Sequence, residues 1–487
     1  MSGTVKRLVI ALMVVVGLVT AACSSSKKSS SSSATTAAPG STAAPGGSNT
    51  TAAPSGNNNG LNNAGGGSLA DQANKAPLTG PAGTGLTRGI TSTSILVGCV
   101  DEGQNFFGFQ DGLAARFNRA NSAGGVNGRK ITLLPCKDDS AGVQANVSAV
   151  QELVNQSNVF AVFSASQYML PGSTDFMVQN QVPFYGWGFL PGFCGNRWGY
   201  GWNGCLAGNS MPATADPVRA IQGALSDAII KAAGIPQTDC PTTNSCSQIK
   251  LAVQADNSAA GRAGNPQYLT LYKQRGASVV YSQTNYPANA AGADPTPYAS
   301  AMVAANPNII MISTPFQDVA PIRNALTAAG YKGVSYDYTN YIGAASLGAA
   351  PALAKSLENE YVNTQIVPQE QETPFIKDAE ADLKAIGKAP SIGLGTEIGY
   401  IEAEQFVEEL QAIGQQLDTK TWDQKINGSG SYSGFTAYAS LQGGPGPMQF
   451  PAAHDLPADC AGIVQVKSSK YVVVTPFACY NSLPFNG

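Results

Sequence analysis

The stretch "GLAARFNRANSAGGVNGRKITLLPCKDDS" (residues 112–140) sets a local order of helix, turn and strand. Leu113 and Phe117 are spaced as on one face of a helix, and the glycine pair 124–125 predicts that this helix ends there. The Asn-Gly pair that follows favours a tight turn, and residues 131–135 are a short apolar run typical of a buried strand. A helix that leads directly into such a strand indicates an α/β fold.

The same alternation of apolar strands and amphipathic helices continues on both sides of this stretch. Strands are predicted at 95–100, 131–135, 159–163, 182–185, 249–253, 278–281, 308–313 and 333–336. Continuous apolar strands separated by helices are typical of parallel sheets covered on both faces. The runs 462–467 and 471–477 flank "SSK" and predict a hairpin instead. Since the folded part is too long for one hydrophobic core, we predict two doubly wound parallel-sheet lobes joined by a hinge, with a C-terminal hairpin.

Composition and motifs narrow the class of protein. The net charge is −3, which gives no sign of a nucleic-acid-binding surface, so no nucleic-acid partner is expected. His454 is the only histidine, and no H-E-x-x-H, P-loop or G-x-S-x-G motif is present. Asp101 and Glu102 could form a catalytic carboxylate pair, but nothing else points to such chemistry. We therefore expect no enzyme, no cofactor and no metal site.

Residues 1–22 have the features of an export signal. After a basic start, the apolar run 8–19 would span about 18 Å as a helix, against a bilayer core of about 30 Å. The small residues Ala21-Ala22 then precede Cys23. This pattern resembles a bacterial lipoprotein signal, although Thr20 stands where that family usually has Leu or a similar aliphatic residue. The resemblance implies that Cys23 becomes the lipidated first residue; an ordinary signal cut nearby is the alternative.

Residues 23–88 are rich in Ser, Ala, Gly and Pro and carry almost no large apolar side chain. Such a composition cannot bury enough apolar surface to offset the entropy of ordering, so we predict a flexible tether. The predicted location is extracytoplasmic, with the folded part lipid-anchored to the cell membrane.

The eight cysteines after Cys23 predict disulfides, because an even number in an exported protein is typical of them. Many connectivities are possible from the sequence alone. Pairing sequence neighbours gives Cys194–Cys205, Cys240–Cys246 and Cys460–Cys479, which leaves Cys99–Cys136. Cys99 and Cys136 end neighbouring predicted strands, which can supply the Cα separation of roughly 4.4–6.8 Å that a disulfide needs.

The 112–140 stretch resembles the signature of extracellular solute-binding proteins of the leucine/isoleucine/valine type, which have the type I periplasmic-binding fold. The matching residues are Asn121, Gly124, Gly125, Val126, Asn127, Gly128, Arg129, Asp138 and Asp139. The sequence "YIEAEQFVEEL" (400–410) is similar to a late helix of that family, and the similarity covers about residues 92–480. It implies a small-molecule ligand, an ABC transporter permease as partner and a monomer. A ligand sensor that acts with a receptor is the rival function.

Within this frame we predict how the chain divides between the lobes. Residues 89–213 would form the first part of lobe 1, residues 214–358 lobe 2, residues 359–445 a return to lobe 1, and residues 446–487 a hairpin of lobe 2.

A ligand is expected at the carboxyl ends of the strands, where loops and helix N-termini expose unpaired N–H groups. The candidate loops are 101–108, 164–168, 186–189, 255–262, 313–318 and 337–341. The candidate ligand-binding residues in them are Asp101, Phe106, Phe107, Ser164, Ser166, Gln167, Trp187, Phe189, Asn257, Phe316, Asp337 and Tyr338.

The resemblance assigns roles to some of these residues. It implies that Ser166 holds a ligand carboxylate and that Phe316 packs on the ligand. Trp187-Gly188-Phe189 replaces the family's small residue and hydroxyl, and Asp337 is the nearest acid to the family's ammonium-binding Glu. These differences favour a larger or flatter solute than valine, amino-acid-like, amide or aromatic. A branched-chain amino acid is the alternative.

Each candidate also has a structural interpretation. Asp256-Asn257 could cap the following helix, and Phe106 and Phe107 could belong to the core. Trp187 and Phe189 could pack beside Cys194 instead of on a ligand. Glu397, at the start of a late helix, is interpreted as a favourable charge at that helix terminus.

Overall fold

The computed structural model describes residues 77–479 apart from internal gaps. The gaps are residue 104, residues 206–226, 236–247, 259–260, 263–264, 266–268, 270–276 and 288–292, residue 339, and residues 429–449 and 455–459. The chain divides into two units, Met1–Gly56 and Asn57–Gly487, and all described residues belong to the second. The predicted signal peptide, Cys23 and the Cys240–Cys246 pair lie outside the described residues.

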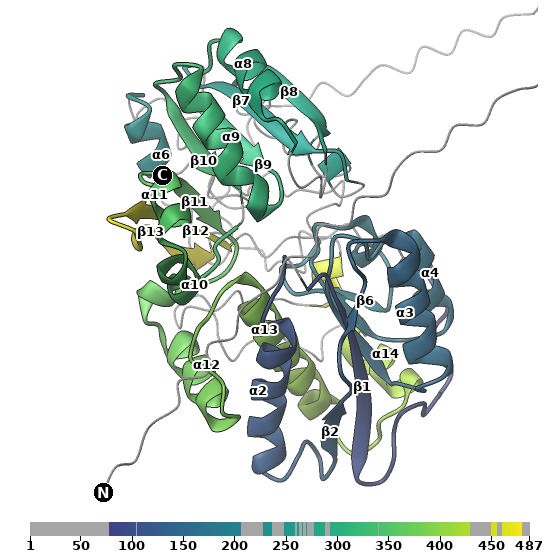
Figure 1. Ribbon diagram of the computed structural model, residues 1–487. Helices are drawn as coiled ribbons and strands as arrows, with labels where there is room; N and C mark the ends of the chain where they lie inside the picture. Colours follow the sequence, from purple (N-terminus) through teal and green to yellow (C-terminus); the bar gives the residue numbers. More distant parts are fainter. Residues whose placement is uncertain are drawn as a thin grey trace, which may run out of the picture. The chain divides into compact units, whose positions relative to one another are not determined.

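The first sheet is parallel and comes from the first half of the chain. Its order is β2 (Lys130–Leu133), β1 (Ser94–Asp101), β4 (Ala161–Ala165), β5 (Phe184–Gly186) and β6 (Gly199–Gly201), with β3 (Lys137–Asp138) paired to the end of β1. Every residue of β4 is buried, as expected for a strand covered on both faces. These strands form the first lobe, shown in blue in Figure 1.

Helices cover both faces of this sheet. Its helices are α2 (Phe109–Ser122), α3 (Val143–Asn155), α4 (Pro171–Gln179), α12 (Pro374–Ala385), α13 (Leu394–Ile413) and α14 (Thr419–Ile426). In Figure 1, α2 and α13 lie on one side of the strands and α3 and α4 on the other. Helices α2 and α13 approach each other closely, since a Cβ at Gly112 would collide with the backbone oxygen of Thr396 and one at Gly399 with that of Phe109. Glycine on both helices therefore permits this backbone approach.

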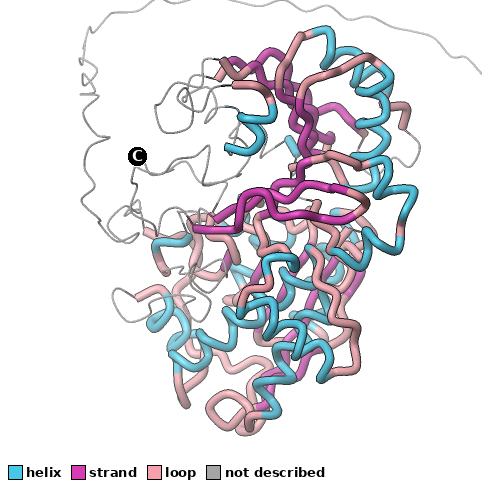
Figure 2. Tube along the Cα trace, turned by 90° about the vertical axis from the view of Figure 1, so that its left-hand side faces the viewer, coloured by secondary structure: helices cyan, strands magenta, loops and turns pink. Residues whose placement is uncertain are grey.

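The second sheet is parallel apart from its C-terminal hairpin. Its order is β13 (Lys470–Cys479), β12 (Cys460–Lys467), β11 (Tyr361–Thr364), β10 (Val334–Asp337), β9 (Ile309–Ser313), β7 (Lys250–Asp256) and β8 (Ser278–Tyr286). Strands β12 and β13 run antiparallel and side by side, as Figure 2 shows in magenta. The helices around it are α6 (Asp227–Ala232), α8 (Thr296–Ala304), α9 (Phe316–Ala328), α10 (Ala344–Ala349) and α11 (Pro351–Ser356). Two parallel-sheet lobes with a C-terminal hairpin confirm the predicted fold class.

The lobe boundaries differ from the prediction in two places. Strand β11 pairs with β10 and β12, so the chain returns to the first lobe after Thr364 and not at residue 359. The short segment η6 (Ala452–His454) packs on β6 of the first sheet, so only the hairpin from Cys460 onward belongs to the second. Neither segment has a long apolar run of its own. Its place in the fold depends on its pairing or packing partners, so the sequence pattern could not predict it.

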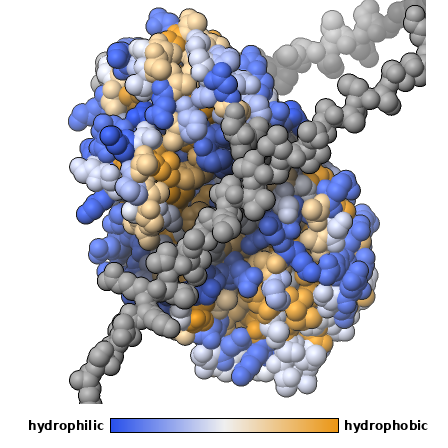
Figure 3. Space-filling view, viewed as in Figure 1, coloured by the Kyte–Doolittle hydropathy of each residue, from blue (hydrophilic) through white to orange (hydrophobic). Residues whose placement is uncertain are grey.

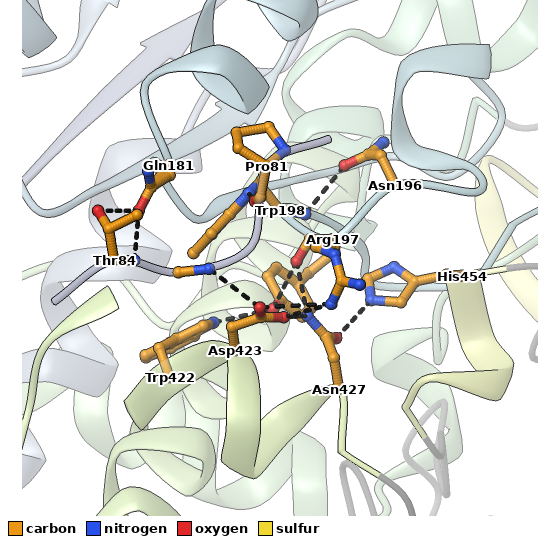
Figure 4. Close-up of polar contacts among 12 residues, drawn as sticks. Pro81, Thr84, Gln181, Asn196, Arg197, Trp198, Trp422, Asp423, Asn427 and His454 are labelled. Carbon is orange, nitrogen blue, oxygen red and sulfur yellow. Dashed lines mark hydrogen bonds and ion pairs between the residues drawn. The ribbon is translucent and has the colours of Figure 1, made fainter. Parts of the chain in front are cut away.

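The predicted tether is too long at its C-terminal end. Residues 79–90, here called the strap, pack on the first lobe. The backbone N–H of Thr79 donates to the Gly195 oxygen (2.9 Å), that of Thr84 to Gln181 Oε1 (2.8 Å) and that of Leu86 to Thr419 Oγ1 (2.9 Å). Figure 4 shows part of this region. The Arg88 side chain adds bonds to the Val159 oxygen (3.0 Å) and the Asn180 oxygen (2.9 Å). The bonds from the strap's backbone could not be predicted, because no side-chain pattern in residues 79–90 reports them.

His454 has a structural place beside the strap. Its Nδ1 lies 2.9 Å from the Gly199 oxygen and its Nε2 lies 2.8 Å from Asn427 Oδ1 (Figure 4). Asp423 accepts from the Gly83 N–H (3.0 Å) and pairs with Arg197 (3.1 Å), so one cluster joins strap, β6, α14 and η6. Burial lowers the pKa of His454 to about 3.

Two disulfides are present among the described side chains. Cys99–Cys136 joins the end of β1 to the loop after β2, with the Cα atoms 4.6 Å apart, and Cys194–Cys205 closes a loop with Cα atoms 5.2 Å apart. The β12–β13 register places Cys460 opposite Cys479.

Exposed large apolar side chains on the described surface are scattered. They are Leu86, Phe107, Val143, Val280 and Val472, each in a different element or loop. On the face drawn in Figure 3, hydrophilic residues (blue) are mixed with smaller apolar areas (orange). Of the helices that the structure describes, none is long and apolar enough to cross a membrane.

Candidate ligand-binding site

A pocket of about 50 Å³ lies where strands of both sheets end. Its lining residues follow the carboxyl ends of β1, β4, β5, β7, β9 and β10, with one more at the start of α13. They are Asn105, Phe106, Gln167, Trp187, Phe189, Asp256, Gly261, Ser313, Thr314, Pro315, Tyr338, Asn340 and Leu394. Such a position is where open parallel sheets bind ligands, because helix N-termini and loop N–H groups converge there.

Aromatic rings form the wall of the pocket on the first lobe. The Phe106 and Trp187 rings are 6.2 Å apart and meet edge to face, and the Trp187 and Phe189 rings are 5.6 Å apart. The Trp187 indole N–H donates to Gln365 Oε1 (2.9 Å), which also accepts from Asn203 Nδ2 (3.0 Å). Trp187 is therefore held on its far edge by the segment that leaves β11 and returns to the first lobe.

The loop that carries Trp187 is stabilised by its own contacts. The backbone N–H of Gly188 donates to Asn203 Oδ1 (2.9 Å), and Asn203 lies inside the loop that Cys194–Cys205 closes. No Cβ fits at Gly188, because it would collide with the Gly204 oxygen. The disulfide thus supports the part of the chain that positions the aromatic wall.

Polar groups on the second lobe face the same pocket lining. The Asn340 side chain donates to the Thr314 oxygen (2.9 Å) and to Asp337 Oδ1 (2.8 Å), which joins the β9 and β10 loops. Thr314 Oγ1 and Asn105 Oδ1 are buried and have no hydrogen-bond partner among the described residues. A buried polar atom without a partner costs about 1–3 kcal/mol, so both atoms favour a ligand that can hydrogen-bond to them.

Acidic side chains dominate the electrostatics around the pocket. Asp256 lines it, and its Oδ1 accepts from the Ser258 N–H (2.7 Å); burial still raises the Asp256 pKa. Glu102 is buried behind Asn105, whose Nδ2 donates to Glu102 Oε1 (2.5 Å). Burial, with the like charges of Asp139 and Asp256, raises the pKa of Glu102 to about 7 against the lowering effect of its hydrogen bonds.

The structure brings part of the predicted ligand-binding set together. Phe106, Gln167, Trp187, Phe189 and Tyr338 all line the pocket. They come from four of the six predicted loops, and the other two loops contribute different residues. Asp256 both caps its loop and lines the pocket, so its structural and functional interpretations are compatible.

Ser164 and Ser166 are not among the lining residues. The Ser164 hydroxyl donates to the Tyr185 oxygen (2.8 Å), and the Ser166 hydroxyl donates to Asp139 while accepting from the Tyr168 N–H (2.9 Å). Asn146 donates to the same Asp139 carboxylate (2.8 Å). Both serines are thus engaged inside the first lobe, and the carboxylate-binding role that the resemblance implied for Ser166 has no support in this geometry.

The remaining candidates also lie outside the lining. Asp101 pairs in register with Asp138, and burial with the charges of Asp138 and Asp139 raises its pKa to about 6. Phe107 is 45% exposed, and Asn257 is exposed. Phe316 begins α9 and packs against the core, and the buried Asp337 accepts from Asn340. Glu397 is buried and accepts from the Val367 N–H (2.7 Å), so it acts within the chain as an internal acceptor.

Sequence reasoning missed more than half of the lining residues. They are Asn105, Gly261, Ser313, Thr314, Pro315, Asn340 and Leu394. All but Leu394 lie in loops that were expected to carry the site, so position after a strand was the available signal. Which side chain of a loop turns inward depends on its local backbone course, which a strand pattern does not report.

Residues 103–470 match the family model described as periplasmic binding protein. The chain belongs to the periplasmic binding protein family. Membership implies an extracytoplasmic solute-binding protein, and the family is not one of enzymes. Within the described ranges no group of His, Cys, Asp and Glu could hold a metal ion. A search of curated proteins gave no match.

Solved structures of this kind are similar in fold. A Thermus thermophilus branched-chain amino acid ABC transporter protein with bound valine has a TM-score of 0.60 and 14% identity over 80% of this chain and 97% of that one. An R. palustris solute-binding protein in complex with 4-hydroxybenzoate has a TM-score of 0.58 and 13% identity over 80% and 98%. A Streptococcus pneumoniae branched-chain amino acid transporter substrate-binding protein with isoleucine has a TM-score of 0.56 and 15% identity over 79% and 100%. Identities this low show the fold alone.

Proposed function

We propose that this protein is a lipoprotein, anchored through Cys23, that captures a small organic solute between its two lobes and delivers it to an ABC transporter permease. The observation that carries this proposal is the pocket, because its lining comes from the carboxyl ends of strands in both sheets. An amino-acid-like, amide or aromatic solute suits the lining, which combines aromatic rings with a few amides, hydroxyls and one carboxylate.

Capture would work by closure of the two lobes around the solute. The chain crosses between the sheets after β11, where Gln365 contacts Trp187 and the Val367 N–H donates to Glu397 of α13. A change of backbone angles in this connection would open or close the pocket, as in hinged binding proteins. A solute that contacts both lobes would favour the closed state, since only that state makes both sets of contacts.

A thermal-shift screen tests the proposal. Purified protein without residues 1–22 is screened against amino acids, amides, amines and aromatic acids. A solute at 100 times its dissociation constant stabilises the folded state by about 2.7 kcal/mol, which is readily measured as a rise in Tm. The rise should be lost in Trp187→Ala. If no solute raises Tm, or if the rise survives that substitution unchanged, the pocket is not a solute site.

A further inference from the structure

The lining of the pocket carries charge of one sign only. Asp256 is its single charged member, and no Lys or Arg is among the lining residues that the structure describes. The cation that acts on Asp256 is Arg262, whose side chain is exposed and donates to the Asn257 oxygen. A ligand carboxylate would therefore enter the pocket without a cationic side chain on its wall.

A second acidic group, from the first lobe, lies next to the lining, since Glu102 accepts from the lining residue Asn105. Glu102, of the first lobe, is 2% exposed, and Asp256, of the second, is 4% exposed. Burial is the main cause of the raised pKa of Glu102, and the Asp256 charge adds to it. Asp318 adds to the set, because burial and the Asp256 charge raise its pKa to about 6. A positive charge placed between the lobes would relieve this repulsion.

The rest of the lining suits the same kind of ligand. The rings of Phe106, Trp187 and Phe189 offer the aromatic faces on which organic cations bind. Thr314 is 6% exposed, and its hydroxyl oxygen has no partner among the described residues, so it can accept a hydrogen bond from an ammonium N–H. Asn105 Oδ1 is a second buried acceptor without such a partner.

We propose that the pocket selects a small organic cation that carries no carboxylate, with Asp256 as its principal counter-charge and Glu102 as a second negative group from the opposite lobe. This inference rests on the proposed solute-binding function and narrows its ligand class. It separates this chain from the similar solved proteins that hold valine, 4-hydroxybenzoate or isoleucine. The cation would draw the two lobes together because each lobe supplies one of the carboxylates.

Matched probes test the charge preference. Benzylamine, benzamide and benzoate share a ring and differ in charge, and isobutylamine differs from valine only by the missing carboxylate. Dissociation constants are measured by titration calorimetry at low salt, where charge effects are least screened. We expect benzylamine to bind at least about tenfold more tightly than benzamide, isobutylamine more tightly than valine, and benzoate not at all.

Variants assign the preference to the proposed carboxylates. Asp256→Asn keeps the size of the side chain and its capping oxygen, and should weaken benzylamine binding by at least about tenfold. Glu152→Gln is the control, since it makes the same change of net charge at a surface pair with Lys137 and should leave binding unchanged. A circular dichroism melt of each variant shows that it is folded.

The pH dependence gives a second readout. Benzylamine stays cationic below pH 8, whereas Glu102 loses its proton around pH 7 under the influence of Asp139 and Asp256. Affinity should therefore rise from pH 6 to pH 8, and Glu102→Gln should flatten this rise. Asp256 and Asp318 are the other acids that act there. Burial raises the pKa of both, that of Asp318 to about 6, so they add to a rise in affinity with pH, and the part of the rise that Glu102→Gln removes belongs to Glu102.

The outcomes separate this inference from the function on which it rests. Tighter binding of valine or benzoate than of the matched amine would overturn the cation preference while supporting a solute-binding pocket. Failure of both amines to bind, or an Asp256→Asn variant that binds benzylamine as the parent does, would also overturn it. The proposed function fails if the broad solute screen finds no ligand, or if Trp187→Ala leaves the rise in Tm unchanged.

Discussion

Replacing Trp187 by Ala should separate ligand binding from folding more clearly than any other change in the pocket. The indole ring lies in the pocket lining, between Phe106 and Phe189, and its N–H donates to Gln365. The substitution removes one aromatic wall and the link to the connection between the lobes, but leaves both sheets intact.

The magnitude follows from these contacts. Two aromatic pairs contribute about 0.5–1.5 kcal/mol each, and the indole hydrogen bond about 1 kcal/mol. Trp187→Ala should therefore lower the free energy of unfolding by about 2–4 kcal/mol. Loss of the ring from the ligand should weaken binding by at least about tenfold, which corresponds to about 1.4 kcal/mol. Urea unfolding measures the first quantity, and titration calorimetry with a ligand found in the screen measures the second.

Two control variants divide the effect. Trp187→Phe keeps an aromatic ring but no N–H, so it should lose about 1 kcal/mol of stability and retain most of the affinity. Ser166 lies outside the pocket, and its hydroxyl donates to Asp139. Ser166→Ala should therefore reduce stability without weakening ligand binding. An unchanged dissociation constant in Trp187→Ala, or a large loss of affinity in Ser166→Ala, would show that the solute binds elsewhere.

Three further predictions concern the anchor, the disulfides and the buried acids. Cys23→Ser should release the protein from the membrane fraction, and equal membrane retention on an immunoblot would contradict lipidation. Cys136→Ala opens a disulfide of sequence separation 37 and should cost about 4 kcal/mol, against about 3 kcal/mol for Cys205→Ala with separation 11; urea unfolding compares them. Burial raises the pKa of Glu409 to about 8, so the folded state holds a proton that the unfolded state releases near its ordinary value, and stability should fall as pH rises from about 5 to 9. Glu409→Gln should flatten this fall in Tm, and a parent Tm that rises over this range would refute the assignment.

Strands with continuous apolar runs were predictable from the sequence. The runs 95–100 and 308–313 correspond to β1 and β9, because a strand covered on both faces must be apolar along its whole length. The hairpin was predictable for another local reason, because two strand-like runs flank the short turn at Ser468 and Ser469, which both have positive φ. Strands β6 and β11 were not, since "GYG" and "YVNT" carry no such run and become strands only through their neighbours.

The candidate site divides in a similar way. The sequence determined that the ligand contacts would follow the ends of strands. The order of strands and helices decides which loops gather at one edge of a parallel sheet. The pocket accordingly includes Phe106, Gln167 and Trp187. Only the tertiary structure decided that Thr314 and Asp256 line it while Ser166 serves a buried network, since the direction of a loop side chain depends on contacts between segments distant in the sequence.

The segment that precedes the folded body shows the same division. Composition alone predicts that the residues after Cys23 form a tether. They are poor in large apolar side chains, and folding requires apolar surface to bury. Only the tertiary structure decided that residues 79–90 belong to the folded body. Their backbone N–H groups bond to Gln181, Gly195 and Thr419, and a backbone donor is the same for every residue type except proline, so its partner leaves no trace in the local sequence.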